Sequence, residues 1–344
     1  MGHATTAAHR PSSGRRIAHL NDIAFVASTL ATAQAARGDR AIVVDPAKPG
    51  GEWPYPRKAL TVPLRAAAVI SAIARIVAYR PDVVHVHYAT HAPVGAVIGR
   101  PFVVHCHGSD VRSLAIDGPL WQVLRWTTRR AGAVIAATPD LLPRVRILRS
   151  DAEFIPNPID VGRFAPGGEP SRDVLLGVRL HPVKGAATAI DAVAELVRRR
   201  PQTTVTIVDD GPLAGYAARR LGPTGLLVPR IRHARMVDIL RAHRVTLGQF
   251  RLGILSQFEL EAMACGVPLV ADLHAVGPYA EAPPVPSSED VASIAAQLSS
   301  WLEDDAERRA AGLAMRGWVE RVHAAGVVAG RLDELYERAR KVRA

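Results

Sequence analysis

The sequence predicts an α/β protein made of two doubly wound, Rossmann-like domains, each built on a parallel sheet, that face a cleft. Three observations support this prediction. Short, nearly continuous apolar runs alternate with amphipathic stretches along the chain, which is typical of parallel strands covered by helices on both faces. The 344 residues suffice for two domains of ordinary size. A polar stretch rich in Pro and Gly, residues 157–172, divides the apolar runs into two series.

The first series predicts an N-terminal domain over residues 15–160, preceded by a disordered tail over residues 1–14. Its apolar runs predict strands at 17–20, 41–44, 83–87, 102–107 and 133–137. Helical periodicity predicts helices at 24–37 and 65–79. A linker is expected over residues 161–172.

The second series predicts a C-terminal domain over residues 173–328. Strands are expected at 174–178, 204–208, 225–228, 245–249 and 268–271, and helices at 187–199, 234–243, 255–265 and 288–302. A final helix near residues 331–340 lies within the segment 329–344, and we expect it to pack back on the N-terminal domain.

The charge of the chain is positive and uneven. Of a formal net charge of +11, most falls in residues 1–160, which hold 19 Lys and Arg against 11 Asp and Glu. This excess fits an anionic partner such as a phosphate, an acidic glycan or a membrane surface, and equally a generally Arg-rich composition. The chain shows no helix-turn-helix, zinc-finger or aromatic RNA-binding pattern, so we expect no nucleic-acid partner.

Cysteine usage and apolar runs bound the location of the protein. Cys106 and Cys265 fall in predicted buried segments without a CxxC partner, which argues against a disulfide framework and a zinc site. No apolar signal-peptide core follows the N-terminus. The longest apolar run, residues 66–79, is interrupted by Arg75 and is expected to be too short to span a bilayer. A cytoplasmic location follows, with peripheral contact at the inner membrane face left open.

The aromatic and basic stretch 121–130 has two interpretations. Its tryptophans and arginines could touch a membrane surface. Alternatively Leu120, Val123, Leu124 and Thr127 form the buried face of an ordinary helix, which we favour because basic amphipathic helices are common on protein surfaces.

The most informative stretch is residues 249–272. It predicts a strand end, a turn, a helix closed by Gly266 as left-handed C-cap, and a strand after Pro268. Backbone N–H groups at the start of that helix form an anion site reinforced by the helix dipole. Glu261 lies inside the helix among apolar residues and needs a polar partner, for which a sugar hydroxyl is a natural candidate.

Polar residues also gather at predicted strand ends. His107, Gly108 and Asp110 follow the fourth strand, where doubly wound sheets place ligands. His85 and His87 alternate on one strand, so both side chains lie on one face. These histidines could hold a metal, but no carboxylate stands at ligand spacing, and histidines that face a polar cleft are the favoured interpretation.

In the second domain, cations flank a predicted strand–helix turn. Arg179 ends a strand and Lys184 starts a helix, where a cation is poorly placed unless an anion lies between the two. A turn at Asp210-Gly211-Pro212-Leu213 follows the next strand, and Ile231 follows a later one, where backbone groups could contact a base.

Taken in this order, these motifs resemble the retaining nucleotide-sugar glycosyltransferases of the GT-B fold, glycosyltransferase family 4, over residues 15–340. The stretch Glu261-Ala-Met-Ala-Cys-Gly-Val-Pro268 is the strongest element. His107-Gly-Ser-Asp110 resembles the histidine motif of the first domain, and Ile155-Pro-Asn-Pro-Ile-Asp160, followed by Arg163 and Phe164, resembles the start of the linker.

The resemblance implies a role for each motif. Arg179, Lys184 and the N–H groups of residues 255–257 would hold the donor diphosphate, Glu261 the ribose hydroxyls, and His107 the donor sugar near its reacting carbon. The expected donor side comprises Arg179, Lys184, Gly211, Ile231, Gly253, Leu255, Ser256, Gln257 and Glu261, and the acceptor side His87, Gly108, Ser109 and Asp110. The nucleoside-diphosphate sugar is a co-substrate, and neither a cofactor nor a metal is implied.

Two positions depart from the family pattern. A second Glu, which contacts the donor sugar, usually stands eight residues before the one matching Glu261, and this chain has Gly253 there. Either Gln249 or Gln257 replaces that contact, or the contact is absent; a related branch with Gln-Phe-x-x-Gly before the helix fits better. The first loop, usually Gly-rich, reads His19 to Phe25 here, which puts backbone binding of an acceptor phosphate in doubt.

The leading hypothesis is a metal-independent retaining hexosyltransferase that moves a sugar from a nucleoside-diphosphate sugar to an acceptor hydroxyl, with the acceptor possibly anionic or lipid-linked. The first alternative, motivated by Gly253, is a sugar-nucleotide-binding partner subunit without turnover. The second alternative is a metal-dependent hydrolase using His85, His87 and His107, whose barrel would need eight strand–helix repeats around one core.

Overall fold

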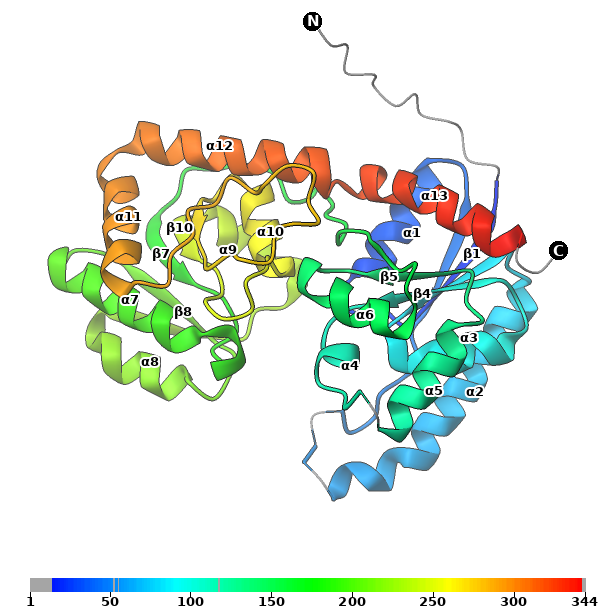
Figure 1. The fold of residues 1–344 in the computed structure, drawn as a ribbon. Helices are drawn as coiled ribbons and strands as arrows, with labels where there is room; N and C mark the ends of the chain where they lie inside the picture. The colour runs from blue at the N-terminus through cyan, green and yellow to red at the C-terminus, as the bar shows by residue number, and fades with distance from the viewer. Residues whose placement is uncertain (1–13, 52, 55, 117, 342–344) are drawn as a thin grey trace, which may run out of the picture. The chain divides into compact units, whose positions relative to one another are not determined.

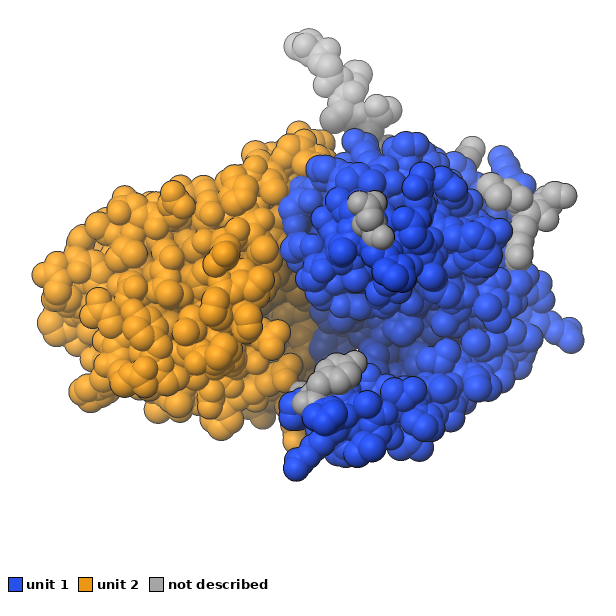
Figure 2. Space-filling model, turned by 60° about the horizontal axis from the view of Figure 1, so that its bottom comes forward, with its two compact units in different colours: residues 1–158, 325–344 blue, residues 159–324 orange. Residues whose placement is uncertain are grey.

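A computed structural model describes residues 14–51, 53–54, 56–116 and 118–341 of the chain. The tail expected over residues 1–14 lies outside the described residues, apart from Gly14. The chain forms two compact units: residues 1–158 with 325–344, and residues 159–324 (Figure 2). Each unit contains a parallel sheet flanked by helices, so the predicted α/β class with two parallel sheets is confirmed (Figure 1).

The first unit is built on a six-stranded parallel sheet of order β2-β1-β3-β4-β5-β6. Its strands are β1 (Arg16–Leu20), β2 (Arg40–Val44), β3 (Val83–His87), β4 (Phe102–Cys106), β5 (Ala133–Ala136) and β6 (Glu153–Phe154). The order reverses between β1 and β3, which makes the crevice at their carboxyl ends the expected ligand position. The two-residue strand β6 was not predicted.

Helices cover both faces of this sheet. They are α1 (Val26–Ala36), α2 (Val62–Tyr79), α3 (Ala92–Ile98), α4 (Ser109–Arg112), α5 (Pro119–Thr128), α6 (Leu142–Leu148) and α13 (Ala325–Lys341). Short 3-10 turns precede three of them: η1 (Arg57–Thr61), η2 (Ala89–His91) and η3 (Pro139–Leu141). Helices α1 and α13 share an apolar core with one face of the sheet, and α2, α3 and α5 form a layer of their own (Figure 1).

The second unit is built on a five-stranded parallel sheet of order β11-β10-β7-β8-β9. Its strands are β7 (Arg172–Leu176), β8 (Val205–Asp209), β9 (Gly225–Pro229), β10 (His243–Leu247) and β11 (Leu269–Val270). Its helices are α7 (Ala186–Arg199), α8 (Ala214–Leu221), α9 (Met236–Arg241), α10 (Gln257–Ala264), α11 (Val291–Glu303) and α12 (Asp305–Val322), with 3-10 turns η4 (Pro182–Lys184), η5 (Gly222–Thr224) and η6 (His233–Arg235). Here the order reverses between β7 and β10.

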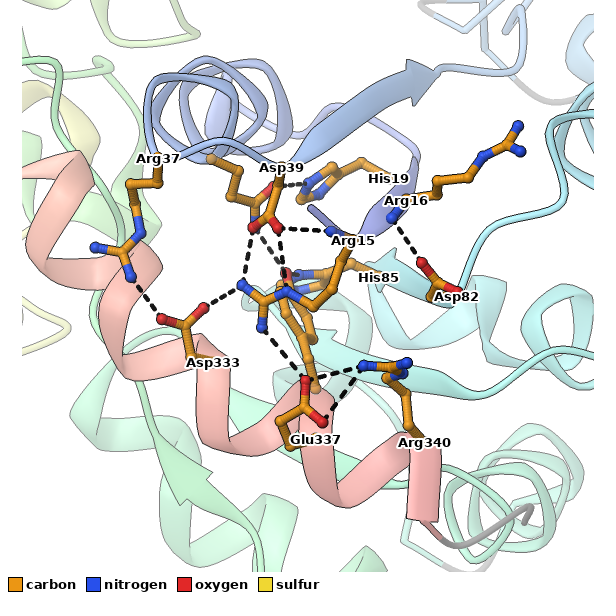
Figure 3. Close-up of polar contacts among 12 residues, drawn as sticks. Arg15, Arg16, His19, Arg37, Asp39, Asp82, His85, Asp333, Glu337 and Arg340 are labelled. Carbon is orange, nitrogen blue, oxygen red and sulfur yellow. Dashed lines mark hydrogen bonds and ion pairs between the residues drawn. The ribbon is translucent and has the colours of Figure 1, made fainter. Parts of the chain in front are cut away.

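Helix α13 completes the first unit from the far end of the chain. Its apolar face, which includes Tyr336, packs on the sheet beside α1. Ala339 packs closely on Gly132: a Cβ added at Gly132 would lie 2.3 Å from the Ala339 Cβ. Polar contacts fix its outer side: the Arg15 guanidinium donates to Asp39 (2.8 Å) and to Asp333 (2.5 Å) (Figure 3). Burial opposes the charge of Arg15, but its two carboxylate partners outweigh that effect and raise its pKa.

Helix α2 is more exposed than its apolar sequence suggests. Together with η1 it makes a helical stretch, Arg57–Tyr79, that is long and apolar enough to cross a membrane, although only 17% of its apolar window is buried. The expectation that this run is too short to span is therefore wrong on length, because the helix begins before residue 66. Ala72 and Ile76 are its buried side chains, and it packs on β1, β2 and α3.

Helix α5 combines the two interpretations of the stretch 121–130. Leu124 and Thr127 are buried, as expected of an ordinary helix. Leu120 and Val123 were assigned to that buried face but are more than 40% exposed, so this part of the prediction is wrong. Trp126 is exposed as well.

Candidate functional site

The donor-side residues lie on the segments that follow the carboxyl ends of β7, β8, β9 and β10, which are neighbours in the sheet of the second unit; Gln257 and Glu261 lie in α10, which follows β10. Backbone bonds join these loops in pairs. The Phe250 N–H donates to the Lys184 carbonyl (2.8 Å), which connects the loops after β7 and β10 across the point where the strand order reverses. The Leu180 N–H donates to the Asp210 carbonyl (2.7 Å), which connects the loops after β7 and β8.

Gly211 is required by this close approach. Its φ of +136° is unfavourable for residues with a side chain, and a Cβ there would lie 2.4 Å from the Leu180 carbonyl oxygen. The Asp210-Gly211 turn therefore sits against the backbone of the neighbouring loop. Its role in the structure is to bring the two loops together.

Lys184 is held by a chain of side-chain contacts. Its Nζ donates to Gln249 Oε1 (3.3 Å), and the Gln249 amide Nε2 donates to the Ile254 carbonyl (2.8 Å). Glu259, which is fully buried, accepts from the Gln249 backbone N–H (2.9 Å). The lysine is thus positioned through the loop that leads into α10.

The start of α10 is capped within the protein. Ser256 is the N-cap residue, and Glu259 accepts from its backbone N–H (2.9 Å) and from its hydroxyl, forming a capping box. The expectation that the Ser256 N–H is available to an anion is therefore corrected: Glu259 occupies it. At the other end of α10, Gly266 adopts a φ of +73°, which confirms the predicted left-handed C-cap.

Glu261 has a protein partner. It is 2% exposed, and its Oε1 accepts from His233 Nε2 (2.7 Å). The other side of His233 is held by Arg163, whose Nη2 donates to the His233 carbonyl (2.6 Å). His233 was not identified from the sequence, since an isolated histidine on a loop carries no distinguishing signal.

The cations differ in their surroundings. The Arg179 side chain is 62% exposed, and Arg179 and Arg230 approach the two oxygens of the Asp210 carboxylate from 4.0 and 3.8 Å. Ile231 follows Arg230 and lines an open hollow of about 430 Å³ with Pro229, Arg232, Arg235, Asp238 and Ile239. The guanidinium groups of Arg179 and Arg230, which lie near the Asp210 carboxylate, could also bind an anionic ligand.

Gly253 has a structural reason to be glycine. Its φ is +67°, and an added Cβ would lie 2.4–2.5 Å from the ring of His274. The Ala275 N–H also donates to the Gly253 carbonyl (2.9 Å). The loop that carries His274 therefore packs where the family's usual Glu side chain would begin.

In the first unit, His107 follows β4 on a loop that Asp110 organises. The buried Asp110 carboxylate accepts from the backbone N–H groups of Ala89 (2.6 Å), Gly108 (2.6 Å) and His107 (3.1 Å). Burial raises its pKa, although these bonds oppose the shift. Asp110 therefore holds the backbone of the histidine loop through its N–H groups.

Two further residues complete this loop. Gly108 adopts a φ of +147° against the Arg112 side chain. The Ser109 hydroxyl bonds to the Tyr88 hydroxyl (2.6 Å), and Tyr88 itself has a φ of +81°, a strained value for an aromatic residue at a strand end.

The ring of His107 is oriented by His87, which lies beside it on β3. His107 Nε2 and His87 Nδ1 are 3.1 Å apart, and His87 Nε2 and His19 Nδ1 are 2.9 Å apart. The His85 and His87 rings stack at 4.2 Å, which confirms that they share one face of the sheet. Burial lowers the pKa of His107 to about 3 and of His19 to about 4, so both rings are neutral near pH 7.

Two sets of imidazoles come close enough to be considered for a metal: His19 with His85 and His87, and His87 with His105 and His107. Within each set the nitrogens lie within 4.8 Å of one another. His19, His87 and His107 are linked through hydrogen bonds between their ring nitrogens, as described above. The unit's open six-stranded sheet also differs from the eight-stranded barrel that the hydrolase alternative requires.

The first loop, between β1 and α1, departs from a Gly-rich loop in sequence but shares its type of backbone. Asn21, Ala24 and Phe25 have φ values of 70°, 49° and 63°, the left-handed region that glycine usually supplies. The Asn21 amide donates to the His87 carbonyl (3.2 Å), and Lys48 donates to its Oδ1 (2.5 Å).

The chain is similar to known proteins in sequence and in fold. The sequence profile described as Glycosyltransferase Family 4 matches residues 23–163, and the profile described as Glycosyl transferase-like matches residues 191–337. Together the two matches cover most of both units.

Among similar proteins, a phosphatidyl-myo-inositol mannosyltransferase of Mycolicibacterium smegmatis is 32% identical over 286 residues, 74% of this chain and 71% of that protein. A GDP-mannose-dependent alpha-(1-6)-phosphatidylinositol monomannoside mannosyltransferase of the same species is 30% identical over 197 residues. That match covers 48% of this chain, which spans about half (51%) of that relative's length.

Solved structures with the same fold include a sucrose-phosphate synthase from Thermosynechococcus elongatus (TM-score 0.71, 17% identity, 95% of this chain and 100% of that one). A second is an Anabaena protein in complex with UDP and glucose (TM-score 0.66, 16% identity, 94% of this chain and 99% of that one). With two parallel-sheet units, matching family profiles and a 32% identical relative over most of its length, the chain belongs to glycosyltransferase family 4 and has the GT-B fold.

Proposed function

We propose that this glycosyltransferase is retaining and metal-independent, and that it moves a hexose from a nucleoside-diphosphate sugar to a hydroxyl of a lipid-linked acceptor. The observation that carries the proposal is the position of Arg179 and Lys184 on the segment that follows β7, and of buried Glu261 on α10, which follows the neighbouring strand β10. Cations there suit a diphosphate, and a buried carboxylate suits ribose hydroxyls.

The proposed chemistry is stabilisation of separated charge. The bond between the sugar carbon and the diphosphate oxygen breaks, and Arg179 and Lys184 hold the charge of the departing diphosphate. The acceptor hydroxyl oxygen attacks the same face of the sugar carbon, and its proton passes to the departing diphosphate. Two cations can supply the neutralisation that a bound metal supplies elsewhere. His107, which burial keeps neutral, is proposed to hydrogen-bond the transferred sugar.

A lipid-linked acceptor is supported by the surface of α2, α3 and α5, which we call the apolar layer. Helix α2 contacts α3, and α3 contacts α5. Large exposed apolar side chains on and beside them include Leu60, Val62, Leu64, Ile70, Val97 and Trp126. Residues 56–81 contain five cations and no acid.

This combination of apolar and cationic side chains suits the interface of an anionic bilayer. The two mannosyltransferase relatives are named for phosphatidylinositol-based acceptors. We therefore propose that the protein binds peripherally at the inner membrane face, with the apolar layer as its contact surface. Because α2 also packs on β1 and β2, we propose that it lies on the bilayer and does not cross it.

The donor site is tested with nucleotides. Melting temperature is measured with GDP, UDP and ADP and with their sugar conjugates, with and without chelator. We expect one nucleotide series to stabilise the protein in the presence of chelator. Transfer is then measured with that donor: Arg179→Ala and Lys184→Ala should each lower kcat/KM about a hundredfold, on the order of 3 kcal/mol.

Arg198→Ala is the matched control, because Arg198 is an exposed arginine of the same unit that pairs with Glu195 on its own helix. Near-normal rates for both site variants would contradict the assignment. Nucleotide binding without transfer to any lipid-linked acceptor would favour the partner-subunit alternative, and activity that chelator removes would favour the hydrolase.

Membrane binding is tested by vesicle flotation. The protein should float with anionic vesicles at low salt, and less so at high salt or with zwitterionic vesicles. Leu64→Ser combined with Ile70→Ser should abolish flotation. Leu313→Ser, at an equally exposed leucine of α12 in the second unit, is the control. Flotation that survives the double substitution would overturn the assignment of the apolar layer.

A further inference from the structure

Five histidines form a polar stripe through the otherwise apolar face of the first sheet that α1 and α13 cover. His19 on β1 is in register with His85 on β3, and His87 with His105 on β4. The side chains preceding them on this face, Ile17, Val83 and Val103, are apolar core residues. The stripe runs from the middle of the sheet to its carboxyl edge, where His107 stands.

A single chain of hydrogen bonds connects His107 to α1. His107 Nε2 pairs with His87 Nδ1 (3.1 Å), His87 Nε2 with His19 Nδ1 (2.9 Å), and His19 Nε2 with Gln34 Oε1 (2.8 Å). Gln34, His19 and His87 are all buried, with at most 1% of each side chain exposed. We call this chain the relay.

A second branch starts from the same amide. Gln34 Nε2 donates to the Tyr336 hydroxyl (3.0 Å), which lies 2.7 Å from His85 Nδ1, and His85 Nε2 lies 3.2 Å from His105 Nδ1. Tyr336 belongs to α13, and Figure 3 shows this helix packed beside His85 and His19.

The direction of every bond in the relay follows from the amide. An amide oxygen can only accept, so His19 carries its proton on Nε2. Burial lowers the pKa of all three rings, so each is neutral and has one proton. His19 Nδ1 must then accept from His87 Nε2, and His87 Nδ1 from His107 Nε2. His107 is left with an unprotonated Nδ1.

The opposite orientation of the Gln34 amide reverses the whole relay. Its NH₂ would donate to His19, and the proton of each ring would move to Nδ1, including that of His107. Mixed arrangements place two protons or none between a pair of nitrogens in a dry interior, which is costly. The Tyr336 hydroxyl couples this choice to the second branch: as the amide stands, it accepts from the NH₂ and donates to His85 Nδ1, and a reversed amide would require the hydroxyl and His85 to reverse as well.

We propose that Gln34 and Tyr336 are positioning residues that fix the tautomer of His107, so that its Nδ1 presents a lone pair and accepts a hydroxyl proton from the transferred sugar. The role of the tautomer in transfer rests on the proposed function; the tautomer itself does not. The proposal connects α13, at the opposite end of the chain, to the chemistry of the site through four side chains.

The tautomer is measured directly, by NMR of the full chain carrying ¹⁵N-labelled histidine. The His107 signals are identified by their loss in His107→Gln. We expect wild-type His107 to bear its proton on Nε2. Tyr336→Phe keeps the ring but removes the hydroxyl that accepts from the Gln34 NH₂ and joins the two branches, and it should shift the His107 nitrogens toward a mixture of tautomers. Gln34→Met, which has a similar volume without an amide, should do the same and serves if Tyr336→Phe does not fold.

Two matched controls separate the relay from general effects. Tyr79→Phe removes another tyrosine hydroxyl of the same unit, one that donates to the Arg40 carbonyl. Asp333→Asn weakens the docking of α13 without touching the relay. Both should leave the His107 nitrogens unchanged. Wild-type His107 protonated on Nδ1, or a tautomer unmoved by both relay variants, would overturn the proposal.

Transfer kinetics form the second arm. If only the Nε2–H tautomer is competent, kcat should follow its population across the variants, falling about twofold where the two tautomers are equally populated. Nitrogen shifts that move while kcat does not would refute the catalytic part of the proposal. Full activity of His107→Gln would contradict the proposed role of His107 in transfer. The tautomer of His107 measured by NMR in the wild-type protein would not be affected by that result.

Discussion

Glu259 and Glu261 lie two residues apart on α10, and both are buried, but they differ in their hydrogen-bond partners. Glu259 accepts from backbone and side-chain donors of Ser256 and from the Gln249 N–H, all within the protein. Glu261 accepts a hydrogen bond from His233 Nε2 through one of its two oxygens. A carboxylate can accept about four hydrogen bonds, so Glu261 keeps capacity for ribose hydroxyls.

We therefore expect the same substitution, Glu to Gln, to affect stability at one of these positions and nucleotide binding at the other. Glu259→Gln places an NH₂ among donors and should destabilise the second unit by about 1–3 kcal/mol. Glu261→Gln keeps an acceptor for His233 and should mainly weaken nucleotide binding, about tenfold. Thermal unfolding and calorimetric titration with the cognate nucleoside diphosphate measure the two effects. Normal nucleotide affinity in Glu261→Gln would contradict the assignment.

Gly253 shows why the family's usual second Glu cannot simply be restored here. Its positive φ opposes any side chain, and so does the His274 ring, which would lie 2.4 Å from an added Cβ. Gly253→Glu should lower stability by about 1–3 kcal/mol without improving sugar binding. Adding His274→Ala should recover the steric part of the loss and leave the backbone part.

The control for this experiment is Gly277→Glu, in the segment after β11 that also carries His274, where an added Cβ meets nothing within 4 Å. It should leave the melting temperature nearly unchanged. If Gly253→Glu were as stable as this control and bound donor more tightly, neither the backbone conformation of Gly253 nor the His274 ring would explain why glycine stands at this position.

At the scale of elements, α13 is held to the rest of the first unit by an apolar face and by polar contacts, among them the Asp333 carboxylate, which is shared between two arginines. Asp333 bonds Arg15 and Arg37, each at 2.5 Å, whereas Glu337 approaches Arg15 only to 3.9 Å and is half exposed (Figure 3). Asp333→Asn should cost about 1–2 kcal/mol in urea unfolding. Glu337→Gln should cost under about 0.5 kcal/mol; equal losses would show that the bridging geometry is unimportant.

The sequence predicted the elements with strong periodicity and missed short ones. Each of the ten predicted strands occurs within two residues of its expected start, because a parallel strand buried on both faces is a nearly continuous apolar run. Strand β6 has only two residues and helix α4 only four, too few for any period to be recognised. Helix α12 was also missed: its apolar residues, four of them alanines, alternate with seven charged residues.

The places of the candidate site residues in the fold were predictable from the sequence, whereas their hydrogen-bond partners were not. Motif spacing indicated Lys184, His107 and Glu261, which stand at strand ends or in the helix that follows. Contacts such as that of His233 with Glu261, or of Gln34 with His19, join residues on different elements, and nothing local in the sequence specifies them. The occupation of the Ser256 N–H by Glu259 was missed although Ser-x-x-Glu is a capping-box pattern.

At the scale of the whole molecule, the buried histidines make the first unit sensitive to acid. A histidine whose folded-state pKa lies below its unfolded value of about 6.5 binds its proton only in the unfolded chain between those two pH values. Stability is therefore complete above about pH 6.5 and falls as the pH drops. Each of His19, His85, His87, His105 and His107 contributes up to about 1.4 kcal/mol per pH unit.

Hydrogen exchange measured at pH 7.5, 6.5 and 5.5, and corrected for the intrinsic pH dependence, checks this expectation for each unit separately. Protection in β1, β3 and β4 should fall before protection in β7, β8 and β10, since five histidines with a lowered pKa lie on or directly after the strands of the first group, whereas the strands of the second group carry His243 alone. Simultaneous loss in both units, or earlier loss in the second, would contradict it.

The position of α13 also bears on the order in which the chain acquires its structure during synthesis. The second unit is continuous, residues 159–324, whereas the first unit lacks a core helix until residues 325–341 have left the ribosome. At about 5–20 residues per second, the nascent first sheet waits on the order of ten to forty seconds with α13 missing from its histidine-lined face. The part translated first is thus completed last, and a chaperone that binds nascent chains would meet that open face throughout the interval.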